Sequence, residues 1–572
     1  MPVTATEPAM RLKLLAFTAA AVCLAGPAAV ADATADAAAL ALIDNPQVCG
    51  RAGSAITTAP VTSMVMVPGF GAATYAVDAT PEAQAWFDHG VRLRWAFEHT
   101  ESVRAFRKAR ALDPDCGMCA WGEAWALGPN LNGGGNDDAS QRAALTAARD
   151  ARRLARDATP LQKQMIDALI QRYSGMKHSR GRRFARTMDR LALRNPTDLL
   201  VASATADAWM LNADEWWDDE GKAADPGITR AMTLLEQTLA RAPDDPGAIH
   251  LYIHLTEWSD DPHKAIPYGE RLARLTPGAS HLVHMPSHTY YRVGRYRDAM
   301  RSNVEAVALD RKYVELANSP NGIHGKPLHA HNIHFGMGGA LMAGGATDGL
   351  TLADSFLSTW PDIAPDNAWR QLMANDAYAI YGRFADQDRV AALKEPPAAN
   401  TLLRTAWRYA RGEAAARRGD AAAVLTEAQA MAALRTGIPD TAPQARDSKD
   451  FIELFQKVLE GRAAMISGDH AAAIAAYARA AAIQAQDSEG GDPPIIWYPT
   501  RRSLAAAMLA SGDAAGARAK IEELLKDWPA DPYSYFVLAQ AETALGDSAA
   551  AAEAMRQSRV EWIGGEMTLG LA

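Results

Sequence analysis

Three short segments decide the fold of this chain: HLYIH at residues 250–254, HLVHMPSH at 281–288 and HNIH at 331–334. The first two repeat with a period of 34 residues, because His250 lies 34 positions before His284 and His254 lies 34 before His288. A period of this length is typical of paired antiparallel helices that bury their apolar faces by stacking on neighbouring pairs. We therefore predict an all-α, right-handed helical solenoid.

The third segment keeps the same register relative to a glycine. Its two histidines precede Gly344 by thirteen and ten residues, just as His281 and His284 precede Gly294. The region 248–341 holds ten of the fourteen histidines of the chain. Three successive first helices are therefore predicted to present histidine at matched positions on one shared face.

Charge and the N-terminal sequence limit the class of protein. With 58 basic and 67 acidic residues the net charge is −9, which argues against nucleic acid as the main partner. Basic residues precede an apolar run at 14–24, and the small-x-small sequence at 29–31 is typical of signal-peptide cleavage. We predict a signal peptide over 1–31 and a periplasmic or secreted mature protein. No other stretch approaches ~18 unbroken apolar residues, so no membrane span is predicted.

The rest of the chain divides by pattern into three regions. Residues 32–78 lack a helical period and are predicted to form an extended arm. Residues 79–395 carry helical repeats that include the histidine segments. Regular repeats continue over 396–572, where Gly512 and Gly546 lie 34 residues apart.

Three cysteines follow the predicted signal peptide: Cys49, Cys116 and Cys119. Three thiols cannot all pair within one chain, and an exported protein permits disulfides. The predicted disulfide joins Cys116 to Cys119, or joins one of these two to Cys49. The alternative is a separate redox or metal-binding role, because Cys116 and Cys119 lie at the predicted start of a helix, where amide groups favour a thiolate.

The histidine segments and two further motifs resemble a family of exported bacterial tetratricopeptide-repeat (TPR) proteins of poorly defined function. The further motifs are LDPDCGMC at 112–119 and WYP at 497–499. The resemblance covers most of the mature chain, and its specific part is the histidine segments. It implies that the first helix of each pair lines a concave groove and that the matched histidines contact a ligand there. Ile249 departs from the family pattern, which often has a polar residue at this position.

Matched imidazoles on adjacent helices favour a transition-metal site. His250 and His254 are i,i+4 neighbours, and Glu257 continues their face as a candidate catalytic base or extra ligand. Packed helices lie ~8–10 Å apart, so imidazoles from two helices can converge on one ion. Imidazole suits copper and zinc, and we place copper before zinc, with one or two ions. The candidate ligands are His250, His254, His281, His284, His288, His331 and His334.

Two functions are compatible with this pattern. The first is a metal protein, either a metal-dependent oxidoreductase or a protein that stores or delivers the ion. The second is a TPR scaffold that binds a peptide, a protein or a small molecule in its groove. The clustering favours the metal, since partner-binding grooves more often use Lys, Arg and Asn. We further predict that Pro286 kinks the helix between His284 and His288, and that His324 and His329 are solvated loop residues.

Overall fold

The computed structural model describes residues 61–131, 134–218, 220–319, 321–365, 367–441, 445–487, 493–494 and 496–572. Over these ranges the structure is helical and contains no strand; a single isolated β-bridge joins Trp217 and Ala223. The predicted signal peptide, most of the predicted arm and Cys49 lie outside these ranges. None of the helices in this part of the chain is long and apolar enough to cross a membrane.

The helices that precede the histidine segments are α2 (Pro81–Trp95), α3 (His99–Leu112), α4 (Gly117–Ala126), α5 (Asp138–Leu154), α6 (Pro160–Tyr173), α7 (Arg180–Arg194), α8 (Leu199–Met210) and α9 (Pro226–Arg241). The helices of the histidine region are α10 (Pro246–Thr256), α11 (Ile266–Leu275), α12 (Ser280–His284), α13 (Pro286–Arg292), α14 (Tyr296–Ala317) and α15 (His329–Ala343).

The helices that follow are α16 (Ala346–Thr359), α17 (Ala368–Phe384), α18 (Gln387–Ala391), α19 (Thr401–Arg417), α20 (Ala421–Thr436), α21 (Ala445–Ser467), α22 (His470–Asp487), α23 (Arg501–Ala510), α24 (Ala514–Asp527), α25 (Pro532–Leu545) and α26 (Ser548–Glu561). Three short 3₁₀ segments complete the described structure: η1 (Pro262–Ala265), η2 (Gly322–Gly325) and η3 (Leu569–Leu571).

The helix ends coincide with the signals in the sequence. Asp245 caps α10, because its Oδ1 accepts from the Ala248 N–H at 2.7 Å, and Pro246 is the first helical residue. Gly294 follows α13 and Gly344 caps α15, with φ angles of 76° and 74° in the left-handed region that glycine adopts without strain. The glycine register that aligned the histidine segments is therefore a register of helix ends.

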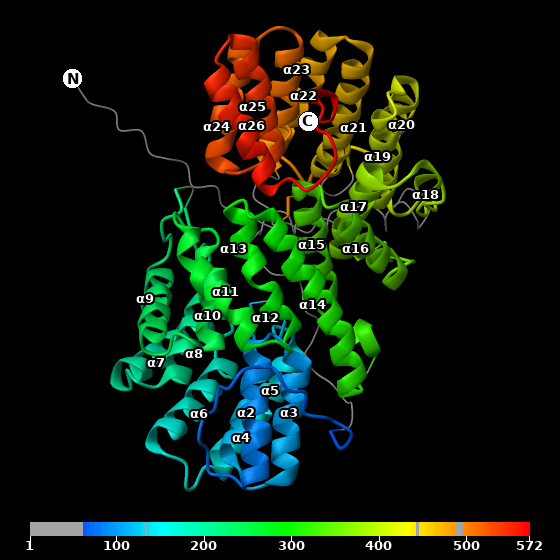
Figure 1. Cartoon of the computed structure of the whole chain (residues 1–572). Helices are drawn as coiled ribbons and strands as arrows, with labels where there is room; N and C mark the ends of the chain where they lie inside the picture. The colour runs from blue at the N-terminus through cyan, green and yellow to red at the C-terminus, as the bar shows by residue number, and fades with distance from the viewer. Residues whose placement is uncertain are drawn as a thin grey trace, which may run out of the picture.

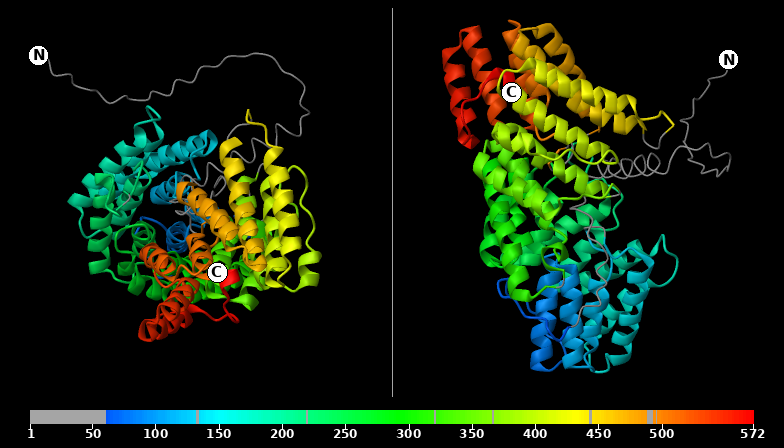
Figure 2. Two further views of the ribbon diagram at one scale, coloured as in Figure 1. Left: turned by 90° about the horizontal axis from the view of Figure 1, so that it is seen from above. Right: turned by 90° about the vertical axis from the view of Figure 1, so that its right-hand side faces the viewer.

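Each helix packs mainly against the helices next to it in sequence, as expected for stacked pairs. Figures 1 and 2 show the N-terminal repeats (blue to cyan) at one end and the C-terminal repeats (orange to red) at the other, with the green histidine region between them. The prediction of an all-α, TPR-like solenoid is confirmed. The domain boundary expected at residues 395–396 stays a prediction; α17 packs against α19 across the loop that contains it.

The apolar core that the structure describes has two large parts. One extends from Met64 to Leu328 and the other from Tyr291 to Trp528. Helices α10 and α12 contribute to the first part, whereas α15 contributes to the second. The histidine segments therefore lie where the two parts of the core meet.

Candidate metal centre

The three histidine segments lie on α10, on α12 with α13, and on α15. Helix α12 ends at His284, and Pro286 is the first residue of α13. Proline lacks the N–H that would continue α12 and clashes with its preceding turn, so the helix is interrupted between His284 and His288 as predicted.

Six of the seven predicted ligands form one buried cluster: His250, His254, His281, His284, His288 and His331. These residues are between 0% and 3% exposed. Their rings are in direct contact, with centroids 4.6 Å apart for His284 and His331 and 5.0 Å apart for His250 and His281. Three groups bring one ligand atom per residue within 4.8 Å of one another: His250, His254 and His281; His281, His284 and His331; His254, Glu257 and His288.

Acceptor groups fix the tautomers of His284 and His288. His284 Nδ1 lies 2.6 Å from Asn303 Oδ1, and the Asn303 amide is oriented by its Nδ2, which donates to the Ala299 carbonyl at 2.8 Å. His288 Nδ1 lies 2.5 Å from Glu257 Oε2. Because both oxygens accept, each Nδ1 carries a proton and each Nε2 of the neutral ring presents a lone pair. Metal-binding histidines are commonly held in this way.

The Nε2 atoms presented by these rings face one another. His284 Nε2 lies 3.0 Å from His288 Nε2 and 3.0 Å from His331 Nε2. The lone pairs of His284 and His288 repel at this distance unless a cation, either a proton or a metal ion, lies between them. Two nitrogen ligands of one ion, with bonds of ~2.0–2.1 Å, are about 2.9–3.4 Å apart. The spacing therefore fits a shared metal ion.

Two phenylalanines cover the cluster. Phe97, in the turn between α2 and α3, lies 4.1 Å from His250 and stacks on His254 at 5.6 Å, measured between ring centroids. Phe335 lies 4.4 Å from His288 on the other side. The φ of Phe97 is 55°, which is unusual for an aromatic residue and costs ~1–3 kcal/mol. The histidines, which the resemblance places on the face of a concave groove, are buried in this structure, and these two rings lie against them.

Burial makes the cluster hard to protonate. It lowers the pKa of His281, His284 and His331 well below the ordinary imidazole value, and the neighbouring imidazoles add to the effect. Burial would raise the pKa of Glu257, but the facing imidazole of His288 holds it below its ordinary range. The cluster thus offers imidazole nitrogens and one carboxylate, a donor set that suits copper and zinc.

His334 is the predicted ligand that the structure keeps apart from the cluster. Its Nε2 lies 3.4 Å from Asp376 Oδ2, and His334 belongs to none of the three ligand groups found among the described residues. Burial lowers the pKa of His334 to about 3 and raises that of Asp376 well above its ordinary value. The register of His334 relative to Gly344 is right, but α17 packs on α15 and brings Asp376 to this side chain.

His329, which the sequence predicts to be solvated, is instead fully buried at the start of α15. Its Nδ1 lies 2.9 Å from Asp310 Oδ2. Asp310 also lies 3.4 Å from Lys326 Nζ, which in turn pairs with Glu98. A buried carboxylate needs such partners, and this need draws His329 into the interior. His324 is exposed, as predicted.

Sequence reasoning missed the residues that orient and cover the cluster: Phe97, Glu98, Asn303, Asp310 and Lys326. They come from the α2–α3 turn, from α14 and from the connection before α15, and no repeat marks them. One signal was available for Asn303, a polar residue on the buried face of α14 between Ala299 and Val307. A polar group in such a position needs a hydrogen-bond partner, which here is His284.

Cys116 and Cys119 form a disulfide in the first turn of α4. Both residues are buried, at 1% and 0% exposed. This pairing is one of the two that the sequence left open. The two sulfur atoms are therefore bonded to each other and are not ligands of the histidine cluster.

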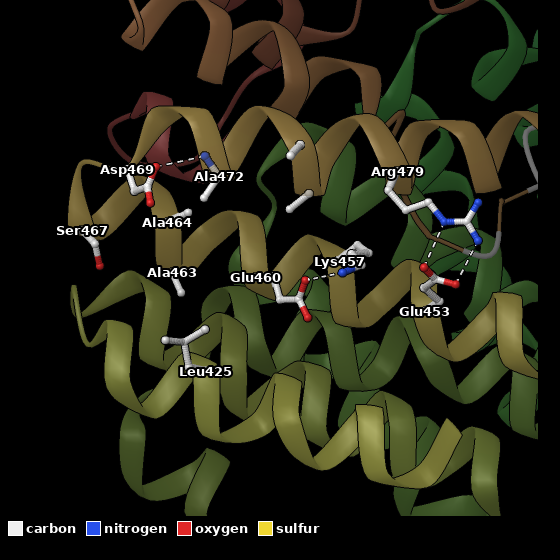
Figure 3. Close-up of a pocket in the computed structure, with 12 residues that line it drawn as sticks. Leu425, Glu453, Lys457, Glu460, Ala463, Ala464, Ser467, Asp469, Ala472 and Arg479 are labelled. Atoms are coloured by element: carbon white, nitrogen blue, oxygen red, sulfur yellow. Dashed lines mark hydrogen bonds and ion pairs between the residues drawn. The ribbon is translucent and has the colours of Figure 1, made fainter. Parts of the chain in front are cut away.

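An open groove lies elsewhere, between α20, α21 and α22 (Figure 3), with a volume of about 690 Å³. Four of its charged side chains pair with one another: Lys457 Nζ lies 2.6 Å from Glu460 Oε2, and Arg479 Nη2 lies 2.9 Å from Glu453 Oε2. Such exposed pairs contribute little to stability, but within each pair the charges compensate each other. These four residues offer no uncompensated charge that would select a partner.

No protein-family model matches the sequence, and no curated protein matches it. Similar solved structures include human IFIT1, in a dimer with m7Gppp-AAAA, with 11% identity and a TM-score of 0.31 over 84% of this chain and 95% of that chain. Yeast Tom70 and the APC/C hetero-tetramer Cut9–Hcn1 are each 11% identical over 83% of this chain, with TM-scores of 0.25 and 0.24. They are covered over 89% and 90% of their own chains. Likeness at this level concerns the helical fold alone and transfers no site or partner.

Proposed function

We propose that this protein binds transition-metal ions in a buried cluster of six imidazoles and one carboxylate, with copper placed before zinc. The observation that carries the proposal is the pair of 3.0 Å contacts from His284 Nε2 to the Nε2 atoms of His288 and His331. Acceptors on the far side of His284 and His288 direct their lone pairs at one another, and a cation stabilises that arrangement. Copper has the highest affinity of the first-row divalent metals for such nitrogen ligands.

The donor groups accommodate one ion or two. The group of His281, His284 and His331 shares no residue with the group of His254, Glu257 and His288. Two ions can therefore be held at separate positions. His250 belongs to a third group, which shares His281 with one of these groups and His254 with the other. A bound ion would supply positive charge and, with copper, one-electron chemistry. The residues of the chain would bind it, orient the imidazoles and exclude water.

Burial favours holding or transferring the ion over turnover of a substrate, because an oxidoreductase needs an open position that its substrate can reach. The contact with His288 supports a role for Glu257 in positioning that ring or as an extra ligand, and its role as a catalytic base stays a prediction. A peptide scaffold would need recognition groups on an exposed surface, and the buried histidines provide none. Export to the periplasm or beyond belongs to the proposal and rests on the N-terminal sequence.

Metal analysis of protein purified from a secreting host, without an affinity tag, tests the proposal. We expect one or two equivalents of copper or zinc in the wild-type protein and a loss of metal in the variant His284→Ala/His288→Ala. The matched control, His178→Ala/His263→Ala, removes two exposed imidazoles and should keep the metal. Circular dichroism reports whether each variant keeps its helices. A wild-type protein that carries no metal, and takes up neither copper nor zinc on titration, would refute the proposal.

A further inference from the structure

A single carboxylate sets the charge of the cluster. The six imidazoles are neutral ligands. Glu257 faces two of them, with Oε2 2.5 Å from His288 Nδ1 and Oε1 3.8 Å from His254 Nδ1. Glu257 is 4% exposed, so solvent screens its charge weakly.

The other buried charges near the cluster are compensated elsewhere. Lys326 balances Glu98 and Asp310 in the neighbouring network. Asp376 faces His334 outside the cluster, and burial disfavours the charged form of both groups. Arg94 pairs with Asp207 at 3.3 Å. These pairs leave Glu257 as the one carboxylate in contact with the six imidazoles in the part of the chain that the structure describes.

The cost of burying an ion rises steeply with its charge. The transfer free energy of an ion from water into a low-dielectric interior grows with the square of the charge, so a divalent ion costs about four times as much as a monovalent ion of the same size. One carboxylate compensates one positive charge. A monovalent ion beside Glu257 leaves the cluster neutral, whereas a divalent ion leaves one uncompensated positive charge and two divalent ions leave three.

We infer, building on the metal-binding function proposed above, that the cluster selects monovalent copper, Cu(I), over Zn²⁺, with Glu257 as the charge partner of the first ion. Zinc sites built from neutral histidines commonly balance the extra charge by ionising a bound water in an open position. The rings of Phe97 and Phe335 cover this cluster and disfavour that compensation.

Competition between the two ions on the full-length protein tests this selection. Metal-free protein is loaded under anaerobic conditions with Zn²⁺ and then challenged with Cu(I), and the order is reversed in a second experiment. We expect Cu(I) to displace Zn²⁺ with dissociation constants that differ by ~100-fold or more. Tighter binding of Zn²⁺ than of Cu(I) would overturn the inference and leave the proposed function intact. Failure to bind either ion would instead overturn the proposed function.

Variants of Glu257 test its role as the charge partner of the bound ion. Glu257→Gln removes the charge and keeps the shape of the side chain. Because Coulomb energy is proportional to the charge of the ion, a ~10-fold loss of Cu(I) affinity should accompany a ~100-fold loss of Zn²⁺ affinity. Glu257→Asp restores the charge and should recover the wild-type ratio. Equal losses for both ions in Glu257→Gln would show that Glu257 acts only by orienting His288, and would overturn its role as charge partner.

Should Glu257→Gln fail to fold by circular dichroism, Glu257→Asp and the wild-type protein still decide the matter. The Cu(I) to Zn²⁺ ratio of the wild-type protein tests the selection directly, without any substitution. Glu257→Asp keeps the charge, but its shorter side chain reaches less far toward His288. It should therefore lower the affinities for both ions by the same factor. A change in the ratio of the two affinities in this variant would contradict the charge argument.

Discussion

Replacing Asn303 by Ala tests whether the tautomer of His284 controls metal binding. Asn303 is fully buried on α14, and its Oδ1 accepts the proton of His284 Nδ1 at 2.6 Å. This hydrogen bond keeps the second proton off Nε2, the atom that faces His288 and His331. Without this acceptor, the tautomer with the proton on Nδ1 is no longer favoured. In the other tautomer the proton is on Nε2, which then has no lone pair to offer a metal ion.

The expected losses of stability and metal affinity in Asn303→Ala depend on which polar groups remain near His284 Nδ1. Ser287 Oγ, at 3.3 Å, is the other polar group near this atom and makes a weak substitute. A buried donor left without a good acceptor costs ~1–3 kcal/mol, so the metal-free variant should lose that much free energy of unfolding. Loss of such an outer partner typically weakens metal binding ~10–100-fold. We expect Asn303→Ala to fall in this range for both Cu(I) and Zn²⁺.

The assay combines urea unfolding of the metal-free protein with competition titration against a chromophoric chelator. Gln484→Ala is the matched control. Gln484 is a buried amide of the C-terminal repeats that accepts from the Thr500 N–H at 2.7 Å and donates to the Tyr498 carbonyl at 2.9 Å. This variant should lose stability and keep its metal affinity. If Asn303→Ala loses stability but binds metal as tightly as the wild-type protein, the tautomer reasoning is wrong.

Three further predictions concern the surroundings of the cluster and the C-terminal repeats. Burial alone would raise the pKa of Asp310, but Lys326 lowers it from 3.8 to about 2. Its ionised form therefore stabilises the fold by about 2 kcal/mol at neutral pH, and this contribution is lost as the pH falls from about 4 to about 2. Urea unfolding over this pH range should therefore show a steeper loss of stability in the wild-type protein than in Asp310→Asn. Phe97→Gly should be more stable than Phe97→Ala by ~1–2 kcal/mol in the same assay, because only glycine adopts the positive φ without strain. Equal stabilities of the two variants would show that the backbone at this position is not strained. Arg462 pairs with Glu413 at 3.0 Å, and both side chains are at most 2% exposed. Arg462→Leu should therefore lower the free energy of unfolding by ~3–5 kcal/mol, because it leaves the Glu413 carboxylate buried and unpaired. Adding Glu413→Leu should recover part of that loss in thermal unfolding. No recovery would show that the unpaired carboxylate does not cause the loss.

The periodic features of the fold could be predicted because they repeat. The 34-residue spacing identified the helix pairs, and the glycine register located the ends of α13 and α15 at Gly294 and Gly344. Histidines spaced four residues apart on one helix, and one repeat apart between helices, necessarily share a face. Six of the seven candidate ligands meet in the structure for this reason.

The contacts that depend on distant parts of the chain could not be predicted in this way. His334 lies beside Asp376 because α17 packs on α15, and no repeat relates these helices. Phe97 reaches the cluster across more than 150 residues of sequence, from a turn with an unusual backbone angle. Phe97 and Phe335 both pack against the buried histidines, whereas the repeat pattern alone predicted only that the histidines share a face.

X-ray absorption spectroscopy of the copper-loaded protein is the most direct test of the central claim, that the histidine cluster is a metal centre. We expect a first shell of nitrogen ligands at ~2.0 Å, with the multiple scattering of coordinated imidazole, and the loss of this signal in His284→Ala/His288→Ala. A first shell of sulfur, or of oxygen without imidazole scattering, would contradict it, as would an unchanged spectrum in the variant.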